Sequence, residues 1–541
     1  MPNMARTVIT WGANSVINAY PMGQDIMRLR DSGGTIITVD PRNTQTAQLM
    51  ADLYLRPKAG TDAALAHGMA RHILHEGLQN QEFIDKYVHG FEQYKAYVEQ
   101  FTPEEVERIT GVPAADMLRA ADLLARDPTG VALPSNSLTH RINGFNTHRA
   151  VLSLMVILGR IDRPGMYMPL QETFCHTGGG FDSLEEEFIN SVRPDGSKTP
   201  VGHDRFPLWA DMVNEGQGMD LIHQIEDGKP YPIRAMACFG VNDRMYPESK
   251  RFLAAMDRLD FTFAADVFWT DVCRHADIVL PVCTSYERGE VKCYANRFVN
   301  FTRPAVEPLY ESRPDTDVIC ELARRMNLGD ELLNSGYDEC IRYIFKPSGI
   351  EDWEAVKDSP LPVPAPNAKM PVPGAYLKAI PTPSGKIELY SEAVAKYKDR
   401  GLEPLPVYIP EENPPEYPFT LITGSRLPNA IHSRGHGVPW LRSLRPDPAV
   451  DICAADAEKL GVKQGDDVVL RTPTGSITVK ANVTELTAPG ELQMFHGYRE
   501  ANVNELIDLD RLDPYTGFPC YKQLPCELEK VNKEAQQSCN T

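Results

Sequence analysis

One stretch of this chain occurs twice, and this repeat limits the possible folds more than any other feature of the sequence. Residues 8–57 and residues 235–281 each begin with a short apolar run and continue through Gly-x-Asn and Tyr-Pro to an aspartate and then to Ala-Asp. The glycine and the aspartate lie 28 residues apart in the first copy (12 to 40) and 26 apart in the second (240 to 266). The matched positions are Gly12 with Gly240, Asn14 with Asn242, Asp40 with Asp266, and Asp52 with Asp277. Two copies predict two related α/β units with two similar ligand-binding halves.

The first copy has the pattern of a β-strand, a helix and a second β-strand. Residues 7–11 and 35–39 are rich in β-branched side chains, which strands favour, and residues 22–30 between them are typical of a helix. We therefore expect a right-handed βαβ unit that binds its ligand beyond the carboxyl ends of the strands. The GxGxxG fingerprint is absent, so the pattern does not indicate an ordinary NAD site.

Asp40 follows directly after the second predicted strand. A carboxylate there can accept hydrogen bonds from ribose hydroxyls or from the N–H edge of a guanine. A turn-forming aspartate before Pro41 is the alternative, and the equivalent Asp266 favours the ligand-binding interpretation. Asp62 opens a helix predicted for residues 63–75, a position compatible both with a helix cap and with a second nucleotide contact.

Composition excludes several classes of protein. At 541 residues the chain is long enough for three or more domains, each with its own core. The net charge of −19 argues against a general nucleic-acid-binding protein. No apolar run reaches the ~18 residues that a membrane-spanning helix needs. The 11 cysteines include no Cys-x-x-Cys pair, so they predict neither a disulfide scaffold nor a zinc or iron–sulfur site.

A proline-rich stretch at residues 404–418 marks a domain boundary. After it, short strand-like runs alternate with glycine turns, a pattern typical of a β-barrel. We predict three domains: a dinucleotide-binding α/β domain at residues 1–170, a second and incomplete α/β domain at 171–403, and a β-barrel domain at 404–541.

Several motifs resemble, in the same order, those of the molybdopterin oxidoreductases of the DMSO reductase and formate dehydrogenase type. They are WGANSVINAYP, TIITVDPRNTQTAQLMADLYLRPKAGTDAAL, THRINGFNTHRAVLSLMVILGRIDRPGM, FGVNDRMYPE, ADVFWTDVCRHADIVLP, TPSGKIELYS and TGSRLPNAIHSR. The resemblance covers nearly the whole chain. It implies an α/β fold class with two related Rossmann-like α/β units plus a C-terminal double-psi β-barrel domain.

The resemblance also implies a cofactor: molybdenum or tungsten held by the dithiolenes of two molybdopterin guanine dinucleotides, for two-electron or oxygen-atom transfer on a small-molecule substrate. Each copy of the repeat would supply one guanine pocket, and arginines would neutralise the pyrophosphates. The candidate contacts in the repeats are Gly12, Asn14, Asp40, Arg42, Asp62, Gly240, Asn242 and Asp266. In the barrel, which would cap both dinucleotides, they are Ser425, Arg426, His432, Ser433, Arg434, His496, Tyr498 and Asn504.

Three residues are candidates for the substrate channel and for catalysis. His140 lies in THRING, which resembles the family's active-site-facing loop, and an imidazole can shuttle protons at neutral pH. A structural hydrogen bond is the alternative for His140. Cys175 and His176 precede three glycines whose backbone can approach a ligand closely, although a polar loop without a chemical role is equally compatible with this segment.

Part of the family's pattern is missing from this sequence. Family members begin with a cysteine cluster that binds a 4Fe–4S centre, and the Cys, selenocysteine, Ser or Asp that ligates the metal precedes the first repeat. This sequence has no such segment. The resemblance therefore implies the C-terminal portion of a catalytic subunit, from a split gene or an incomplete reading frame. Its expected partners are the missing N-terminal portion and an iron–sulfur electron-transfer subunit. A twin-arginine signal would lie upstream, so a cytoplasmic and an exported protein are both compatible with the sequence.

Three functions agree with the resemblance. The first is a redox enzyme that another chain completes, the second is a non-redox, hydratase-like member, and the third is a cofactor-binding or structural subunit without catalysis. Both Gly-x-Asn sequences and both aspartates are present. Their presence favours real dinucleotide binding over the third function.

Overall fold

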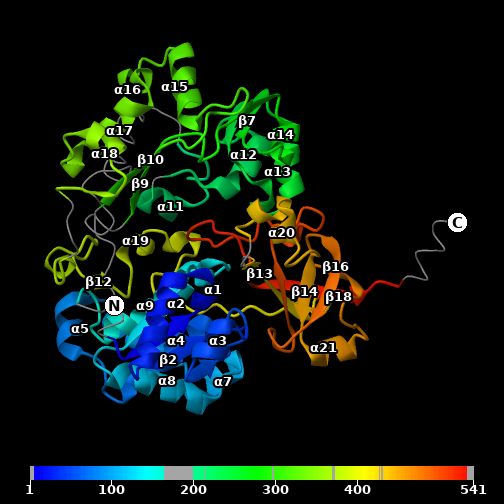
Figure 1. The fold of residues 1–541 in the computed structure, drawn as a ribbon. Helices are drawn as coiled ribbons and strands as arrows, with labels where there is room; N and C mark the ends of the chain where they lie inside the picture. The colour runs from blue at the N-terminus through cyan, green and yellow to red at the C-terminus, as the bar shows by residue number, and fades with distance from the viewer. Residues whose placement is uncertain are drawn as a thin grey trace.

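The structure is a computed structural model. It describes residues 5–163, 199–213, 215–294, 298–367, 372–425, 427 and 430–532. Within these residues the chain forms two α/β units and a C-terminal β-barrel (Figure 1). In this view the second unit, in green, lies above the first unit, in blue, and the barrel, in orange, lies beside them.

The first unit is built on a four-stranded parallel sheet. Its strand order is β3 (Leu53–Leu55), β2 (Thr35–Val39), β1 (Thr7–Trp11), β5 (Val131–Pro134). The chain moves in one direction from β1 to β3 and then returns to the far side of β1, so right-handed crossovers place helices on both faces of the sheet. The helices between the first three strands are α1 (Ser15–Asn18), α2 (Tyr20–Asp31) and α3 (Gln45–Met50). Those of the return include α4 (Asp62–His75), α7 (Pro103–Thr110) and α8 (Ala114–Arg126).

The second unit contains a smaller sheet of the same kind. Its strand order is β6 (Ala235–Phe239), β7 (Phe261–Asp266), β8 (Ile278–Pro281), and all three strands are parallel. This order repeats β1, β2 and β3, and within the described residues the sheet has no strand equivalent to β5. The helices of the unit are α12 (Leu221–Asp227), α13 (Ser249–Met256) and α14 (Asp271–His275).

The turn after the first strand is the same in both units. Gly12 donates its N–H to the Val39 carbonyl at 2.7 Å, and Gly240 donates its N–H to the Ala265 carbonyl at 3.0 Å. Both glycines have a left-handed φ, +66° and +60°, which costs other residues about 1–2 kcal/mol. The glycines that match in the sequence are therefore needed by the same backbone turn.

The repeated Ala-Asp dipeptide also has one role in both units. Asp52 Oδ2 accepts a hydrogen bond from the Ile36 N–H at 2.8 Å, and Asp277 Oδ2 accepts one from the Thr262 N–H at 2.7 Å. In each unit the backbone N–H of the aspartate donates in return to the carbonyl of the same strand residue. This reciprocal pair joins the start of the second strand to the segment that leads into the third, so these aspartates serve the sheet and not a ligand.

The C-terminal domain is a closed six-stranded barrel. Its strands, in order around the barrel, are β13 (Phe419–Ser425), β17 (Glu491–Phe495), β14 (Ala449–Ile452), β16 (Ser476–Val483), β15 (Asp467–Arg471) and β18 (Leu524–Lys530). The pairs β13–β17 and β14–β16 are parallel, and the other pairs are antiparallel. A core of aliphatic side chains, including Leu421, Val450 and Leu492, fills the interior.

The remaining elements do not belong to these three sheets, and residues 290–302 and 363–364 among them form an antiparallel sheet of their own. They are α5 (Gln81–Tyr87), β4 (Val88–His89), α6 (Phe91–Val98), α9 (Gly144–Ile157), α11 (Pro207–Met212), β9 (Glu290–Tyr294), β10 (Phe298–Thr302), α15 (Asp315–Arg325), α16 (Glu331–Ser335), α17 (Tyr337–Phe345), α18 (Trp353–Asp358), β11 (Val363–Pro364), β12 (Ile387–Glu388), α19 (Glu392–Ala395), α20 (Pro439–Arg442) and α21 (Ala454–Lys459). Across the described part of the chain, every helix is too short or too polar to cross a bilayer.

The aspartate contacts lead to a first prediction. We expect Asp52→Ala to weaken the first unit and Asp277→Ala to weaken the second, each by about 1–2 kcal/mol, because each removes a charged acceptor from a backbone N–H. Hydrogen–deuterium exchange should accelerate in peptides that span β2 in the first variant and β7 in the second.

Asp31→Ala, at the exposed end of α2, is the control and should leave exchange in both sheets unchanged. Equal acceleration across the whole chain in either aspartate variant would contradict a local role for these contacts.

Candidate cofactor-binding site

The first unit and the barrel meet at the carboxyl end of β2. Arg42 Nη1 donates to Ser425 Oγ at 2.6 Å, across 383 residues of sequence. Arg42 lies three residues after Val39, the last residue of β2, and Ser425 is the last residue of β13. Two of the candidates from distant parts of the sequence are therefore in direct contact, at the strand end where α/β units bind ligands.

Asp40 presents a buried carboxylate at this interface between the first unit and the barrel, which we call the first joint. Its side chain is 1% exposed, and Oδ1 accepts a hydrogen bond from the Arg42 N–H at 2.9 Å. Among the described residues, Oδ2 has no hydrogen-bond partner. A buried carboxylate oxygen without a donor is unfavourable unless a ligand supplies one. This geometry is compatible with a carboxylate that accepts hydrogen bonds from N–H or O–H groups of a nucleotide.

Lys522 adds a buried positive charge beside Asp40. Its side chain is 7% exposed, and Nζ donates to the Thr423 carbonyl at 2.9 Å. Burial, with the nearby charges of Arg42 and Arg141, lowers the pKa of Lys522 to about 7. A lysine with this pKa lacks sufficient negative charge around it, so the joint favours an anionic ligand.

Arg141 and Asp62 form an ion pair within the same joint. Arg141 Nη1 lies 2.6 Å from Asp62 Oδ2, and Trp11 Nε1 donates to Asp62 Oδ1 at 2.8 Å. All three side chains are buried. Asp62 Oδ2 is paired with Arg141 but accepts no hydrogen bond within the described residues, so the second nucleotide contact suggested by the sequence stays a prediction.

His140 is buried in the same region. Its ring stacks on Phe518 with centroids 4.8 Å apart, and its Nδ1 has no partner within the described chain. Burial, together with the charges of Lys522 and Arg141, lowers the pKa of His140 to about 3. Nδ1 can accept or donate a hydrogen bond to a ligand, and the proton shuttle expected of His140 stays a prediction.

Glu491, at the start of β17, closes the joint from the barrel side. Its Oε1 accepts a hydrogen bond from the Ala59 N–H at 2.8 Å, and burial raises its pKa to about 7. The backbone around it is tied by Arg56, whose guanidinium donates to the carbonyls of Pro41 and Leu486. Contacts of this kind hold the barrel against the loop that carries Asp40.

The second unit offers a similar frame with different side chains. Asp266 Oδ1 accepts a hydrogen bond from the Phe268 N–H at 3.0 Å, as Asp40 does from Arg42. Asp266 is only half-buried, and Phe268 is 72% exposed. The space above Gly240 is open, whereas a Cβ at Gly12 would lie 2.4 Å from Ser137 Oγ. The turn of the second unit therefore has open space beside Gly240, whereas the turn of the first unit is packed against Ser137.

The two repeated asparagines have different partners. Asn14 bonds to Gln45 and Thr46 within its own unit. Asn242 Nδ2 instead donates to Ser433 Oγ of the barrel domain at 2.9 Å. Asn242 and Ser433 thus join the second unit to the barrel, as Arg42 and Ser425 join the first.

The remaining barrel candidates divide between this second joint and internal packing. His432 Nδ1 and His496 Nε2 lie 2.8 Å apart, and His432 has a left-handed φ of +55°. The Asn504 amide donates to the Arg244 carbonyl of the second unit. Tyr498 packs inside the barrel domain, where its hydroxyl donates to the Arg445 carbonyl, and its role at the cofactor stays a prediction.

Three candidates cannot be placed, and one is exposed. Cys175, His176 and Arg426 lie outside the described residues. Arg434 is exposed in a short turn of 3₁₀ helix. Sequence reasoning missed Arg141, Lys522 and Glu491. Arg141 follows His140 directly in the THRING motif, so the motif pointed to the right segment but the prediction named only the histidine. Lys522 and Glu491 stand in no local pattern that distinguishes them from surface residues.

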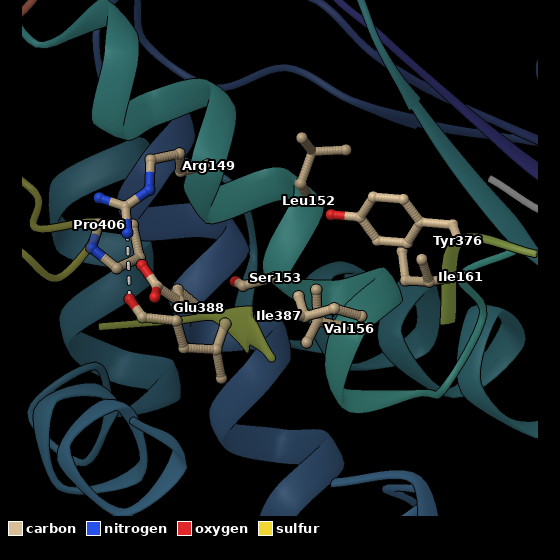
Figure 2. A pocket seen from close by; sticks show the side chains of 10 residues that line it. Arg149, Leu152, Ser153, Val156, Ile161, Tyr376, Ile387, Glu388 and Pro406 are labelled. Carbon is tan, nitrogen blue, oxygen red and sulfur yellow. Dashed lines mark hydrogen bonds between the residues drawn. The ribbon is translucent and has the colours of Figure 1, made fainter. Parts of the chain in front are cut away.

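A cavity of about 220 Å³ lies elsewhere, between α9 and residues 376–406 (Figure 2). It is lined mainly by aliphatic side chains, and none of the cofactor candidates lines it. Arg149 at its edge donates to the carbonyls of Leu389 and Pro404. This arginine ties the 387–406 segment to α9, which explains its burial without a ligand.

Residues 3–325 match the family described as "Molybdopterin oxidoreductase", and residues 419–525 match the "Molydopterin dinucleotide binding domain". The first match alone spans more than half of the chain. This chain belongs to the molybdopterin oxidoreductase family. The family predicted from the motifs is confirmed, and with it, at the level of the family, the cofactor of molybdenum and molybdopterin guanine dinucleotide.

Similar proteins include several named enzymes. The probable oxidoreductase YoaE of Bacillus subtilis is 30% identical over 491 residues, which are 89% of this chain and 68% of the relative. The dimethyl sulfoxide/trimethylamine N-oxide reductase of Rhodobacter capsulatus is 27% identical over 549 residues, 91% of this chain and 64% of the relative. The chain thus spans about two thirds of the length of these relatives.

A solved structure shares the fold. The acetylene hydratase from Pelobacter acetylenicus superposes with a TM-score of 0.84 at 24% sequence identity, over 98% of this chain and 78% of that one. With the closed barrel, this match confirms the predicted fold class of two related Rossmann-like units plus a C-terminal double-psi β-barrel.

The residues at the first joint fit a molybdopterin guanine dinucleotide. A guanine has an N–H edge that suits the unpartnered Asp40 Oδ2, and a pyrophosphate has negative charge that complements the buried Lys522 and its neighbours Arg42 and Arg141. The fit rests on donors and acceptors that are already buried and held in place before any ligand binds.

The pKa of Lys522 leads to a second prediction, for the cofactor-free protein. An unfolded chain keeps the lysine protonated up to about pH 10.4, whereas the folded protein releases the proton near pH 7. Between these values the unfolded state binds more protons, so stability rises with pH. Lys522→Met removes the cost of the buried charge and should stabilise the protein by about 1–3 kcal/mol below pH 7, a gain that shrinks toward pH 10.

Urea denaturation across this pH range measures the effect. Lys463→Met, at an exposed lysine of the same domain, should leave stability unchanged at every pH. A gain for Lys522→Met that stays constant with pH would show that Lys522 is not buried in a charged form.

Proposed function

We propose that this chain binds two molybdopterin guanine dinucleotides between its α/β units and its barrel, and forms the cofactor-holding part of an oxidoreductase. The observation that carries the proposal is the buried set of Asp40, Arg42 and Lys522 at a strand end that the chain builds twice. When bound, the cofactor supplies a molybdenum or tungsten centre for two-electron or oxygen-atom transfer to a small molecule.

In this proposal each joint holds one dinucleotide. Asp40 accepts the guanine N–H groups of the first, and Arg42, Arg141 and Lys522 face its phosphates. Asp266 takes the role of Asp40 for the second, with the Asn242–Ser433 contact at its side. Because Asp266 is half-buried and Phe268 replaces the arginine, we expect the second dinucleotide to be held less by charge than the first.

The neutral His140 lies beside the first site. It excludes water by stacking on Phe518 and keeps Nδ1 free for a hydrogen bond. A phosphate or another anion nearby would raise its pKa toward the neutral range. In this proposal His140 helps to position the first dinucleotide. Its predicted catalytic role, like that of Cys175 and His176, remains a proposal.

Electron transfer needs a partner in this proposal. A relative from Methanocaldococcus jannaschii is named as the alpha subunit of an F420-dependent formate dehydrogenase, and is 27% identical over 98% of this chain. We infer that this chain likewise works with a second redox subunit, of the iron–sulfur type implied by its motifs.

A non-redox reaction is the second candidate. The acetylene hydratase of Syntrophotalea acetylenica is 28% identical over 87% of this chain. A hydratase would carry the same cofactor and would need no electron-transfer partner. Reduction of an artificial dye by substrate distinguishes the two reactions, because hydration transfers no electrons.

Metal and nucleotide content test the central proposal. The full chain, produced in a host that makes the cofactor, should retain molybdenum or tungsten by ICP-MS and release two guanine nucleotides per metal on acid hydrolysis. Protein without either metal and without pterin fluorescence would exclude the proposal.

Asp40→Asn gives the third prediction. The amide keeps the size of the carboxylate but points an N–H group toward the donors of a guanine, so binding of the first dinucleotide should weaken by at least about tenfold. Metal content should fall with guanine content.

Asp52→Asn is the matched control, since this aspartate serves the sheet, and it should retain the cofactor. Full guanine content in Asp40→Asn would exclude Asp40 as the recognition residue.

A further inference from the structure

Two cysteine side chains meet between helices α15 and α17, outside both cofactor-binding joints. Cys320 lies in α15, and Cys340 lies in α17. These helices pack against each other and against α16, and Figure 1 shows the three together at the top of the view. The two thiols hydrogen bond to each other. Within the described residues every cysteine is a free thiol, so this contact brings two reduced sulfurs together.

The two thiols differ in how easily a small molecule can reach them. Cys320 is 4% exposed, whereas Cys340 is half-buried. Cys340 Sγ also donates to the Leu332 carbonyl of α16 at 3.4 Å, which holds its side chain in the space between the three helices. A dissolved oxidant therefore reaches Cys340 first, with Cys320 already beside it as a resolving thiol.

The helices that carry the two cysteines are held by different parts of the structure. α17 contributes Ile341, Ile344 and Phe345 to a hydrophobic core that it shares with β10 and α18. Among the described residues, none of α15 belongs to that core. At its first turn α15 is instead tied to the loop after β8, because Asp315 pairs with Arg288. The thiol contact thus connects two bodies that have separate supports.

We propose that Cys320 and Cys340 are a reversible dithiol–disulfide pair that joins α15 covalently to α17 when the protein meets a peroxide. The Cys340 thiolate attacks one oxygen of hydrogen peroxide, the O–O bond breaks, and a sulfenic acid and a hydroxide form. The Cys320 thiolate then attacks that sulfur, the S–S bond forms, and a second hydroxide leaves.

The reaction balances without any other reagent. The two thiol protons convert the two hydroxides to water, so the two sulfurs lose two electrons in total and the peroxide gains them. A dithiol reductant reverses the reaction by thiol–disulfide exchange. The proposal depends neither on the cofactor nor on the reaction that the cofactor supports.

The surroundings of the pair set its rate. Burial raises the pKa of both thiols, that of Cys340 to about 11. The hydrogen bond from Cys340 and the charge of Arg324 offset part of this rise for Cys320, whereas Asp317 adds to it. The neighbouring Cys320 and Asp330 raise the pKa of Cys340 further. Because the thiolate is the reacting form, the disulfide forms slowly at pH 7, which suits sustained oxidation and not a rapid signal.

Peptide mapping of the peroxide-treated full chain tests the pair directly. Trypsin cuts after Arg324 and Arg325, between the two cysteines, so a disulfide links two separate peptides. Digestion without reductant should yield the linked pair that contains Cys320 and Cys340, and dithiothreitol should separate it. Linkage of either residue to another cysteine, or oxidation of both without linkage, would overturn the proposal.

Hydrogen exchange tests whether the disulfide joins the helices. Peroxide should slow exchange in α15 and α17 by about tenfold or more, because the cross-link restricts their opened states. The slowing should disappear with dithiothreitol and in Cys320→Ser and Cys340→Ser. Cys283→Ser is the matched control, at a buried thiol that contacts Ser312, and it should keep the full effect. Slowing that persists in both pair variants, or linked protein with unchanged exchange, would overturn the proposal.

The rate of linkage gives an independent check on the native protein. Since both thiols are protonated at pH 7, the initial rate of disulfide formation with peroxide should rise about tenfold per pH unit between about pH 7 and pH 9. Quenching with acid and counting the linked peptides at each pH measures this rise. A rate that does not change with pH would overturn the assignment of the reaction to this buried pair.

Discussion

Positive charge buried between the first unit and the barrel is the constraint on which the rest of this structure depends. Arg141 is paired with Asp62, whereas burial, with the charges of Arg42 and Arg141, lowers the pKa of Lys522 to about 7. Burial of an unbalanced charge is costly, and an anionic ligand offsets that cost. The same residues also fix the position of the barrel, because Arg42 reaches Ser425 and Lys522 reaches the Thr423 carbonyl. Cofactor binding and domain arrangement are thus coupled through one set of side chains.

The internal repeat preserves the backbone of the two units more closely than their chemistry. Both units use a glycine turn and a carboxylate that accepts the N–H group two residues later. At that second position the first unit has Arg42 and the second has the exposed Phe268. Each unit then reaches the barrel through a different serine. The two units thus share a backbone arrangement but present different side chains. This combination is compatible with two copies of one ligand, each bound in a different environment.

The two sheets also differ in how completely their faces are covered within the described residues. The first sheet is covered by α4 and its neighbours, whereas the second exposes aromatic and aliphatic side chains at equivalent positions. The two sheets therefore differ in how completely they are covered and agree in their strand order. Coverage of a parallel sheet is a requirement of its apolar side chains and not of its hydrogen bonds, which are already satisfied within the sheet.

By itself, the sequence determined the two βαβ frames, the C-terminal barrel, the family and the placement of Asp40 at a strand end. These features depend on local patterns: a glycine that must adopt a positive φ, alternating side chains and turns of fixed spacing. Only the tertiary structure showed that Lys522, Arg141 and Glu491 lie buried near Asp40, that Asp62 contacts Trp11 and Arg141, and that Tyr498 packs inside the barrel domain. The reason is physical. Whether a charge is buried, and which charges surround it, depends on segments hundreds of residues apart in the sequence, and no local pattern records that proximity.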